Sequence, residues 1–148
     1  MRSPRVLGLL RRFGLELLLA VRPWDLAALP DVVRACADEG VPLGLWPMID
    51  NESGRWANMH NASIFAAFAR RVAEVGPRTL AIDLEPPFEV VRNLSSGERT
   101  LRTLRALRSD GRVFDAARTA FGELADELRA REIDPVGVAL PLVLSDRD

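Results

Sequence analysis

Four short runs of apolar residues divide the chain, and segments with helical periodicity separate them. The runs cover residues 15–21, 42–49, 79–85 and 136–144. Apolar residues occupy both faces of each run instead of alternating with polar ones, which is typical of strands in a parallel sheet that is buried on both faces. The pattern therefore predicts about four parallel strands.

The intervening segments predict helices, and one helix precedes each strand. Glycines follow two of these segments, at Gly40 and Gly76, where they favour the end of a helix. The helical segments are residues 6–13, 29–39, 62–75 and, with a turn near residue 110, 96–131. The order predicts a single α/β domain over residues 1–148, built of parallel βα repeats.

Two architectures have this alternation: an open, doubly wound sheet and a (β/α)8 barrel, or TIM barrel. The chain contains neither G-x-G-x-x-G nor a P-loop motif. Polar and aromatic residues instead follow the predicted strands, as they do at barrel active sites. Because a barrel takes about 250 residues, we expect this chain of 148 residues to form a partial TIM barrel, part of a larger one. A self-contained four-stranded domain, or a half-barrel that two copies close, is the alternative.

Charge and composition exclude several classes of function. Basic and acidic residues number 20 and 21, so we expect no nucleic-acid partner. Cys36 is the only cysteine and His60 the only histidine, which leaves no disulfide within the chain and no cysteine-rich or histidine-rich metal site. Lysine is absent, which excludes a Schiff-base lysine and a Walker-type phosphate lysine. We expect neither a metal nor another cofactor.

The N-terminal segment has only part of the pattern of a secretory signal. Residues 1–21 combine arginines with leucines, but Glu16 interrupts the apolar run and no small-residue cleavage site follows. No run approaches the roughly 20 apolar residues of a membrane span. We expect a structured segment here, no membrane partner, and the cytoplasm as the default compartment.

The clearest chemical signal is a pair of acids in the third predicted strand. Side chains alternate along a strand, so Asp83 and Glu85 share one face, about 6.6 Å apart at a rise of about 3.3 Å per residue. Repulsion and partial burial favour one protonated acid beside one ionised partner, as cleavage of a glycosidic bond requires. Glu85 is the predicted proton donor, and Asp83 would orient it or stabilise developing positive charge. The alternative is a strand that merely ends in solvated acids, although an unpaired charge at Asp83, between two apolar residues, is costly.

The sequence Ile-Asp-Leu-Glu-Pro at residues 82–86 resembles the end of the fourth-strand signature D-x-x-D-x-D-x-E of family-18 chitinase-like glycoside hydrolases. The resemblance implies a (β/α)8 barrel in which Glu85 is the general acid and Asp83 positions the N-acetyl group of the substrate. The two earlier acids of the signature fall on Arg78 and Ala81. The D-x-E strand of family-25 lysozyme-like barrels is similar, so the motif indicates a glycoside-hydrolase-like protein without choosing between families.

Aromatic and polar residues at or beyond the predicted strand ends are candidates for binding a carbohydrate or another small molecule. Indole faces stack on sugar rings, and carboxylate and guanidinium groups bond to hydroxyls. The candidates are Trp24, Trp46, Trp56, Asp50, Arg22 and Asp146. Packing within the sheet is the competing role for Trp46, and pairing with Asp25 is that for Arg22. We expect Asn61 to cap the following helix.

Two other functions fit the same pattern. A metal-dependent sugar isomerase or endonuclease-like barrel would use Glu85 and Asp146 as ligands of a divalent cation. A non-catalytic half-barrel would instead bind partners, or a second copy of itself, through an open sheet edge. A fragment of a barrel lacks part of its cleft, so even a glycoside-hydrolase-like chain of this length can be inactive alone.

Overall fold

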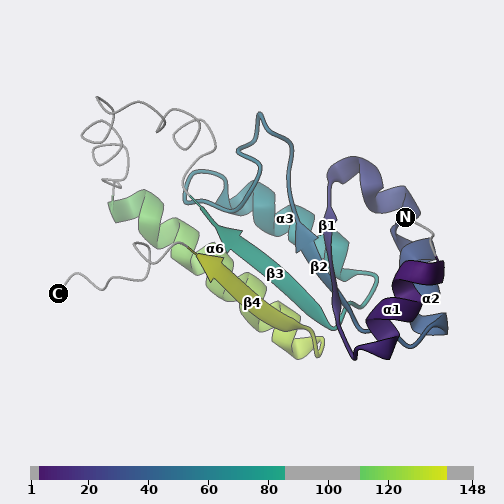
Figure 1. The fold of residues 1–148 in the computed structure, drawn as a ribbon. Coiled ribbons are helices and arrows are strands. Elements are labelled where there is room, and N and C mark those ends of the chain that lie inside the picture. Colours follow the sequence, from purple (N-terminus) through teal and green to yellow (C-terminus); the bar gives the residue numbers. More distant parts are fainter. Residues whose placement is uncertain (1–3, 86–110, 140–148) are drawn as a thin grey trace, which may run out of the picture.

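The structure, a computed structural model, describes residues 4–85 and 111–139. Helices and strands alternate along them, as the apolar pattern predicts (Figure 1). In chain order the elements are α1 Pro4–Arg12, β1 Leu17–Val21, the 3-10 helix η1 Pro23–Ala28, α2 Leu29–Asp38, β2 Leu43–Pro47, α3 Ala62–Ala73, β3 Thr79–Leu84, α6 Gly111–Ala130 and β4 Asp134–Ala139. Asp146 and the first part of the helical region predicted at 96–131 lie outside the described residues.

The strands form one parallel sheet in the order β1-β2-β3-β4. The prediction of an α/β fold with four parallel strands is confirmed. Because the strands run in the same direction, their carboxyl ends meet along one edge of the sheet (Figure 1). The residues that follow each strand are thereby brought to this edge, which we call the carboxyl edge.

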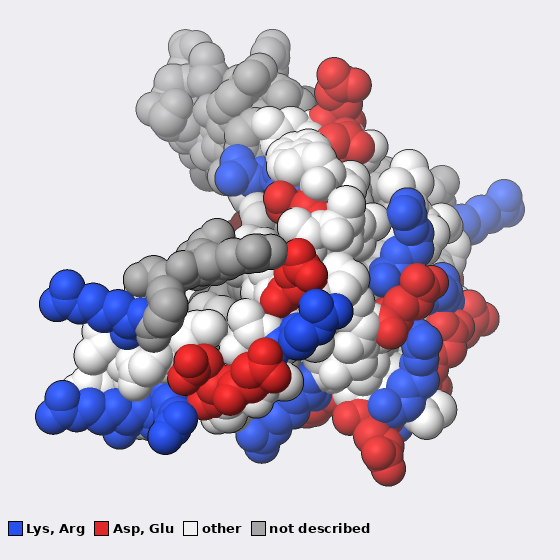
Figure 2. All heavy atoms as spheres, turned by 90° about the vertical axis from the view of Figure 1, so that its right-hand side faces the viewer, with Lys and Arg blue, Asp and Glu red and all other residues white. Residues whose placement is uncertain are grey.

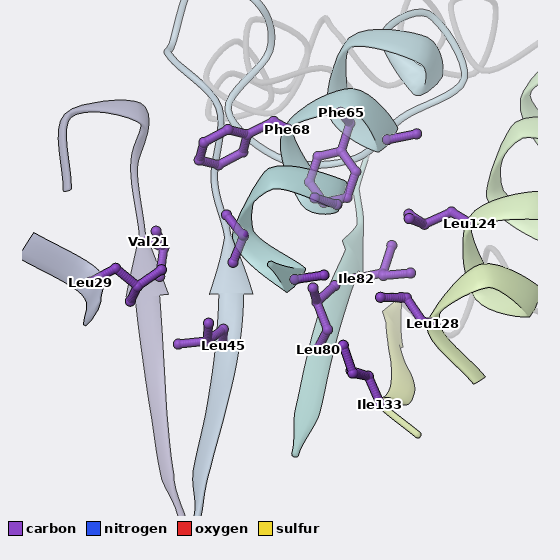
Figure 3. Close-up of a cluster of buried hydrophobic side chains, with 14 of the residues drawn as sticks. Val21, Leu29, Leu45, Phe65, Phe68, Leu80, Ile82, Leu124, Leu128 and Ile133 are labelled. Atoms are coloured by element: carbon purple, nitrogen blue, oxygen red, sulfur yellow. The ribbon is translucent and has the colours of Figure 1, made fainter. Parts of the chain in front are cut away.

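One face of the sheet packs against the described helices, and we call it the covered face. The register places Leu19 beside Leu45 and Leu45 beside Leu80, so these leucines point to the same side. Figure 3 shows Leu45 and Leu80 on the side of the sheet that faces Phe65 of α3 and Leu124 of α6. Leucines of α1 and α2 join the same cluster at its β1 end. A single hydrophobic core therefore lies between the sheet and one layer of helices.

The opposite face, which we call the open face, carries the alternate residues of each strand. Apolar side chains stay accessible there: Leu18 is 50% exposed, Val136 39% and Val138 47%. The strand pattern predicts burial on both faces, whereas the described residues form a helical layer over one face only. A doubly wound sheet has helices on both faces. Sequential strand order with helices on one side is instead compatible with part of a barrel wall.

Two strands, β4 and β1, begin two residues away from the start of the apolar runs that predict them. β4 begins at Asp134, and its second residue is Pro135. Proline is tolerated because β4 is an edge strand of the described sheet: the N–H of Asp134 donates to the carbonyl of Arg78, so the nitrogen of the next residue points away from β3. β1 begins at Leu17 rather than residue 15, because α1 ends in a turn at Gly14, whose φ of +61° is left-handed.

The surface around α1 and α2 carries charges of both signs. Figure 2 shows basic and acidic side chains interspersed there without a broad patch of one sign, as the net charge of −1 leads one to expect. None of the helices in the described ranges is long and apolar enough to cross a membrane.

Candidate functional site

The predicted acid pair lies at the carboxyl end of β3. Asp83 is the fifth residue of the strand and only 7% exposed, although it lies on the open face. Its Oδ1 atom is buried and has no hydrogen-bond partner. Glu85 follows directly after the strand and is partly buried. The strand thus carries one enclosed and one more accessible carboxyl group at the carboxyl edge.

Both carboxyl groups hold their protons more tightly than they would in water. Desolvation raises the pKa of Asp83 above the ordinary value of 3.8. Desolvation also raises the pKa of Glu85 above 4.5, and the negative charge of Asp83 raises it further. The negative charge of Asp83 therefore acts on Glu85. The predicted roles of the two acids in a shared site stay predictions.

The loop between β2 and α3 folds back onto the end of β3. The N–H of Ala57 donates to the carbonyl of Asp83 at 2.9 Å, and the N–H of Glu85 donates to the carbonyl of Ala57 at 3.0 Å. These bonds form a parallel bridge between Ala57 and Leu84. Trp56 directly precedes the bridge residue Ala57. The bridge thereby brings the backbone of one predicted ligand contact close to the end of β3.

The same loop is joined to the end of β1 through Arg22. The Arg22 guanidinium donates to Oδ1 of Asn51 at 3.1 Å and lies 4.8 Å from the centre of the Trp24 ring. Trp24 is 66% exposed. Asp25 accepts a hydrogen bond from the backbone N–H of Arg22, so the expected pairing between these residues involves the main chain. The ends of β1 and β3 are thus linked along the carboxyl edge by one loop.

Asp50 and Ser53 bond to each other and stabilise a turn within this loop. Asp50 accepts hydrogen bonds from the N–H and the hydroxyl of Ser53, and these bonds lower the pKa of its carboxyl group. Its oxygens are thus engaged within a turn. The role of Asp50 as a contact of a bound ligand stays a prediction.

Asn61 occupies the N-cap position of α3, as predicted, but its side chain makes no capping hydrogen bond to the helix. Its amide group instead donates to the carbonyls of Ser53 and Trp56. The two asparagines also accept from each other's backbone: Asn61 Oδ1 accepts from the N–H of Asn58, and Asn58 Oδ1 accepts from the N–H groups of His60 and Asn61. Asn61 is 5% exposed and faces the loop, so its amide is used to hold the loop together.

Trp46 lies in β2 on the open face, beside Ala20 of β1. It is partly buried, and its indole Nε1 atom has no hydrogen-bond partner. Packing alone does not account for this atom, because a buried indole N–H usually finds an acceptor. Sequence reasoning included Trp46 among the ligand contacts but had no signal for the unpaired N–H.

Within the described residues no group of three His, Cys, Asp or Glu side chains is arranged to hold a metal ion. The ligand pair Glu85 and Asp146 cannot be assessed as a geometry, since Asp146 lies outside the described ranges. Searches with this chain match no family model, no curated protein and no solved structure.

Proposed function

We propose that this chain is a carbohydrate-active, glycoside-hydrolase-like protein in which Glu85 and Asp83 supply acid catalysis. The observation that carries the proposal is the presence of two partly or fully buried carboxyl groups at the carboxyl edge, with the pKa of both groups raised. A carboxylic acid whose pKa is raised keeps its proton to a higher pH and can donate it to a glycosidic oxygen. Trp56 and Trp24 at the same edge supply aromatic faces for sugar rings.

The mechanism assigns the two acids different roles. Glu85 is the more accessible group and donates its proton to the leaving oxygen as the glycosidic bond breaks. The bonding electron pair remains on that oxygen, and positive charge develops on the sugar. Water then adds to the anomeric carbon, and the proton that it loses returns to the Glu85 carboxylate. Asp83, deeper in the strand, stabilises the developing charge when it is ionised.

Replacement of Glu85 by glutamine tests the proposal. The Glu85→Gln variant should lower kcat by about 10²–10⁴-fold on any responsive glycoside, because it removes the acidic proton at nearly constant shape. A panel of nitrophenyl glycosides and N-acetylglucosamine oligomers serves as substrate. Glu74→Gln, at the C-terminal end of α3 and therefore near the start of β3 rather than its carboxyl end, is the matched control. Equal turnover by wild type and Glu85→Gln, or no hydrolysis of any panel member by the wild type, contradicts the proposal.

Self-association as a half-barrel is a second candidate function, and the exposed apolar side chains of the open face favour it. β1 and β4 are the two edges of the described sheet. A second copy related by a two-fold axis would place β4 beside the partner's β1 at both seams, in parallel. Light scattering in solution should then give twice the mass of 16.4 kDa, and a strictly monomeric mass at high concentration would rule the dimer out.

A further inference from the structure

Arg22 directly follows β1 at the carboxyl edge, and neighbouring side chains hold its guanidinium group in place. The group lies over the Trp24 ring, 4.8 Å from the ring centre, and its Nη2 atom donates to Oδ1 of Asn51 at 3.1 Å. A stacked ring and a hydrogen bond restrict the rotation of this long side chain. Less conformational entropy is therefore lost when the guanidinium group binds a ligand.

No ion pair among the described residues includes the Arg22 guanidinium group. The nearby Asp25 carboxylate accepts a hydrogen bond from the backbone N–H of Arg22, at 2.9 Å. Arg22 is partly buried, and a partly buried charge without a counter-charge costs free energy. An anion bound at this position would offset part of that cost. The arginines that do form ion pairs within the described ranges are Arg11, Arg34, Arg70, Arg118 and Arg129.

The two Nη groups are the part of the Arg22 side chain that a ligand can reach. Nε is the guanidinium nitrogen that is buried without a hydrogen-bond partner. A guanidinium group has five N–H donors, and Asn51 accepts from one of those on Nη2. Planar oxyanions accept two parallel hydrogen bonds from such a group, and these charge-assisted bonds are about twice as strong as neutral ones. The group therefore favours an oxyanion over a neutral hydroxyl.

Trp24 supplies an apolar surface next to this charge. Its side chain belongs to a residue that is 66% exposed, even though the guanidinium group lies over the ring. The accessible part of an indole can stack on the apolar face of a sugar ring. The loop that bonds to Arg22 through Asn51 also bonds to the end of β3 through Ala57. Arg22 and Trp24 thus lie along the same edge of the sheet as the acid pair.

We propose that Arg22 binds the oxyanion of an acidic sugar, which is the carboxylate of a uronic acid or a sulfate ester, and that Trp24 contacts the ring of that sugar. The inference deepens the proposed function, on which it rests for a glycan as the ligand. It adds that the glycan is negatively charged. Arg22 determines this specificity, because a neutral sugar would leave the guanidinium group without a counter-charge.

Binding of matched charged and neutral glycans tests the site. Oligosaccharides of galacturonate, glucuronate and mannuronate are titrated by calorimetry against the Glu85→Gln protein, so that no ligand is consumed. Their methyl esters keep the sugar ring and lose the charge. Sulfated galactan oligosaccharides and their desulfated forms distinguish a sulfate from a carboxylate. At low salt, at least one acidic ligand should bind about tenfold more tightly than its neutral form, and this ratio should fall as salt is added.

Arg22→Gln, made in the same background, removes the charge and keeps hydrogen-bond donors. It should weaken binding of the acidic ligand about tenfold and leave the affinity for the neutral form nearly unchanged. Arg34→Gln, in α2, is the matched control, because it changes the net charge equally and its arginine pairs with Asp31 of the same helix. This control should bind the acidic ligand as tightly as the parent.

Equal losses in the Arg22→Gln and Arg34→Gln variants would show that only overall charge matters, and would overturn the site. Equal affinity for every acidic ligand and its neutral form, or failure of every acidic ligand to bind, would overturn it too. Should Arg22→Gln fail to fold, the ratio of acidic to neutral binding by the Glu85→Gln protein decides. A chain with a net charge of −1 has no general attraction for anions that could produce this ratio.

The outcomes separate the two proposals. Binding of an acidic glycan that depends on Arg22, without hydrolysis of any acidic or neutral glycoside by the wild type, supports the site and contradicts the glycoside hydrolase. Hydrolysis of a neutral glycoside that the Arg22→Gln substitution leaves unchanged, without binding of any acidic glycan, does the reverse.

Discussion

The covered and open faces of the same sheet differ in chemistry. On the covered face, Leu45 and Leu80 are fully buried beneath helices, and the cluster around them is apolar throughout. On the open face, exposed valines of β4 lie beside an enclosed Asp83 and the unpaired N–H of Trp46. Hydrophobic burial is the main source of folding free energy, so the difference indicates that the covered face supplies most of the stability. The open face keeps polar groups that do not stabilise the fold.

β3 contributes to both faces through its alternating side chains. Leu80 and Ile82 point into the core, while Ala81 and Asp83 point the other way. Truncating a residue that points into the core should therefore destabilise the protein, whereas neutralising the buried carboxyl group of Asp83 should stabilise it.

The largest effect should come from the covered face. Leu80→Ala should lower the free energy of unfolding by about 3 kcal/mol, because it leaves a cavity beneath α3 and α6. Val138→Ala on the open face, where the side chain is 47% exposed, is the control and should cost about 1 kcal/mol or less. Urea denaturation followed by circular dichroism measures both. Similar losses for the two variants would mean that the open face is also part of the core.

A smaller effect, opposite in sign, should come from Asp83. Its pKa is raised in the folded state, so the folded protein binds a proton more tightly than the unfolded chain. The associated loss of stability is absent below pH 3.8, the ordinary value, and develops as the pH rises through the raised pKa. Asp83→Asn should therefore stabilise the protein by about 1 kcal/mol at neutral pH and by nothing near pH 3.

Thermal unfolding at a series of pH values checks the Asp83→Asn prediction. Asp25→Asn is not a suitable control, because its carboxylate accepts a backbone hydrogen bond. Asp38→Asn, at the exposed end of α2, is better. A gain that is the same at pH 3 and pH 7 would show that charge burial is not its cause.

The smallest effect should come from the solvent side of the helical layer. The Arg70 guanidinium donates two hydrogen bonds to the Glu127 carboxylate, at 2.6 and 2.8 Å, and joins α3 to α6. This bond lowers the pKa of Glu127, so its contribution is present at neutral pH and is lost as the carboxylate becomes protonated. Both side chains are exposed, and Glu127→Gln should lower Tm by less than about 2 °C at pH 7. A larger drop would mean that the ion pair, rather than apolar packing, holds the two helices together.

The apolar runs predicted the order and type of the described elements because burial dictates them. Consecutive apolar residues in the runs became strands, and helical stripes such as that of Phe65 and Phe68 became the covering layer. The position of Asp83 in a strand also followed from the apolar run, whereas its shared face with Glu85, which lies after the end of β3, stays a prediction. Local pattern is sufficient where one physical term, the burial of apolar surface, outweighs the others.

The remaining features depend on contacts between distant residues. The bridge of Ala57 to Leu84 joins positions that no periodicity connects. The bonds of Asn61 to the loop depend on where the loop carbonyls lie, and an asparagine pattern does not encode this. The one-sided helical layer follows from the handedness of the connections and the order of the strands, whereas the runs by themselves suggested burial on both sides.

The bridge between Ala57 and Leu84 also affects how much conformational freedom this loop would lose when a ligand binds. The loop from β2 to α3 is fastened at its far end to the backbone of β3, and Asn61 ties its middle to its base. These hydrogen bonds constrain the loop in one conformation, so it does not need to close over a ligand. A molecule that docks against it meets groups already in position, so little conformational freedom is lost on docking and affinity depends mainly on shape and polar complementarity.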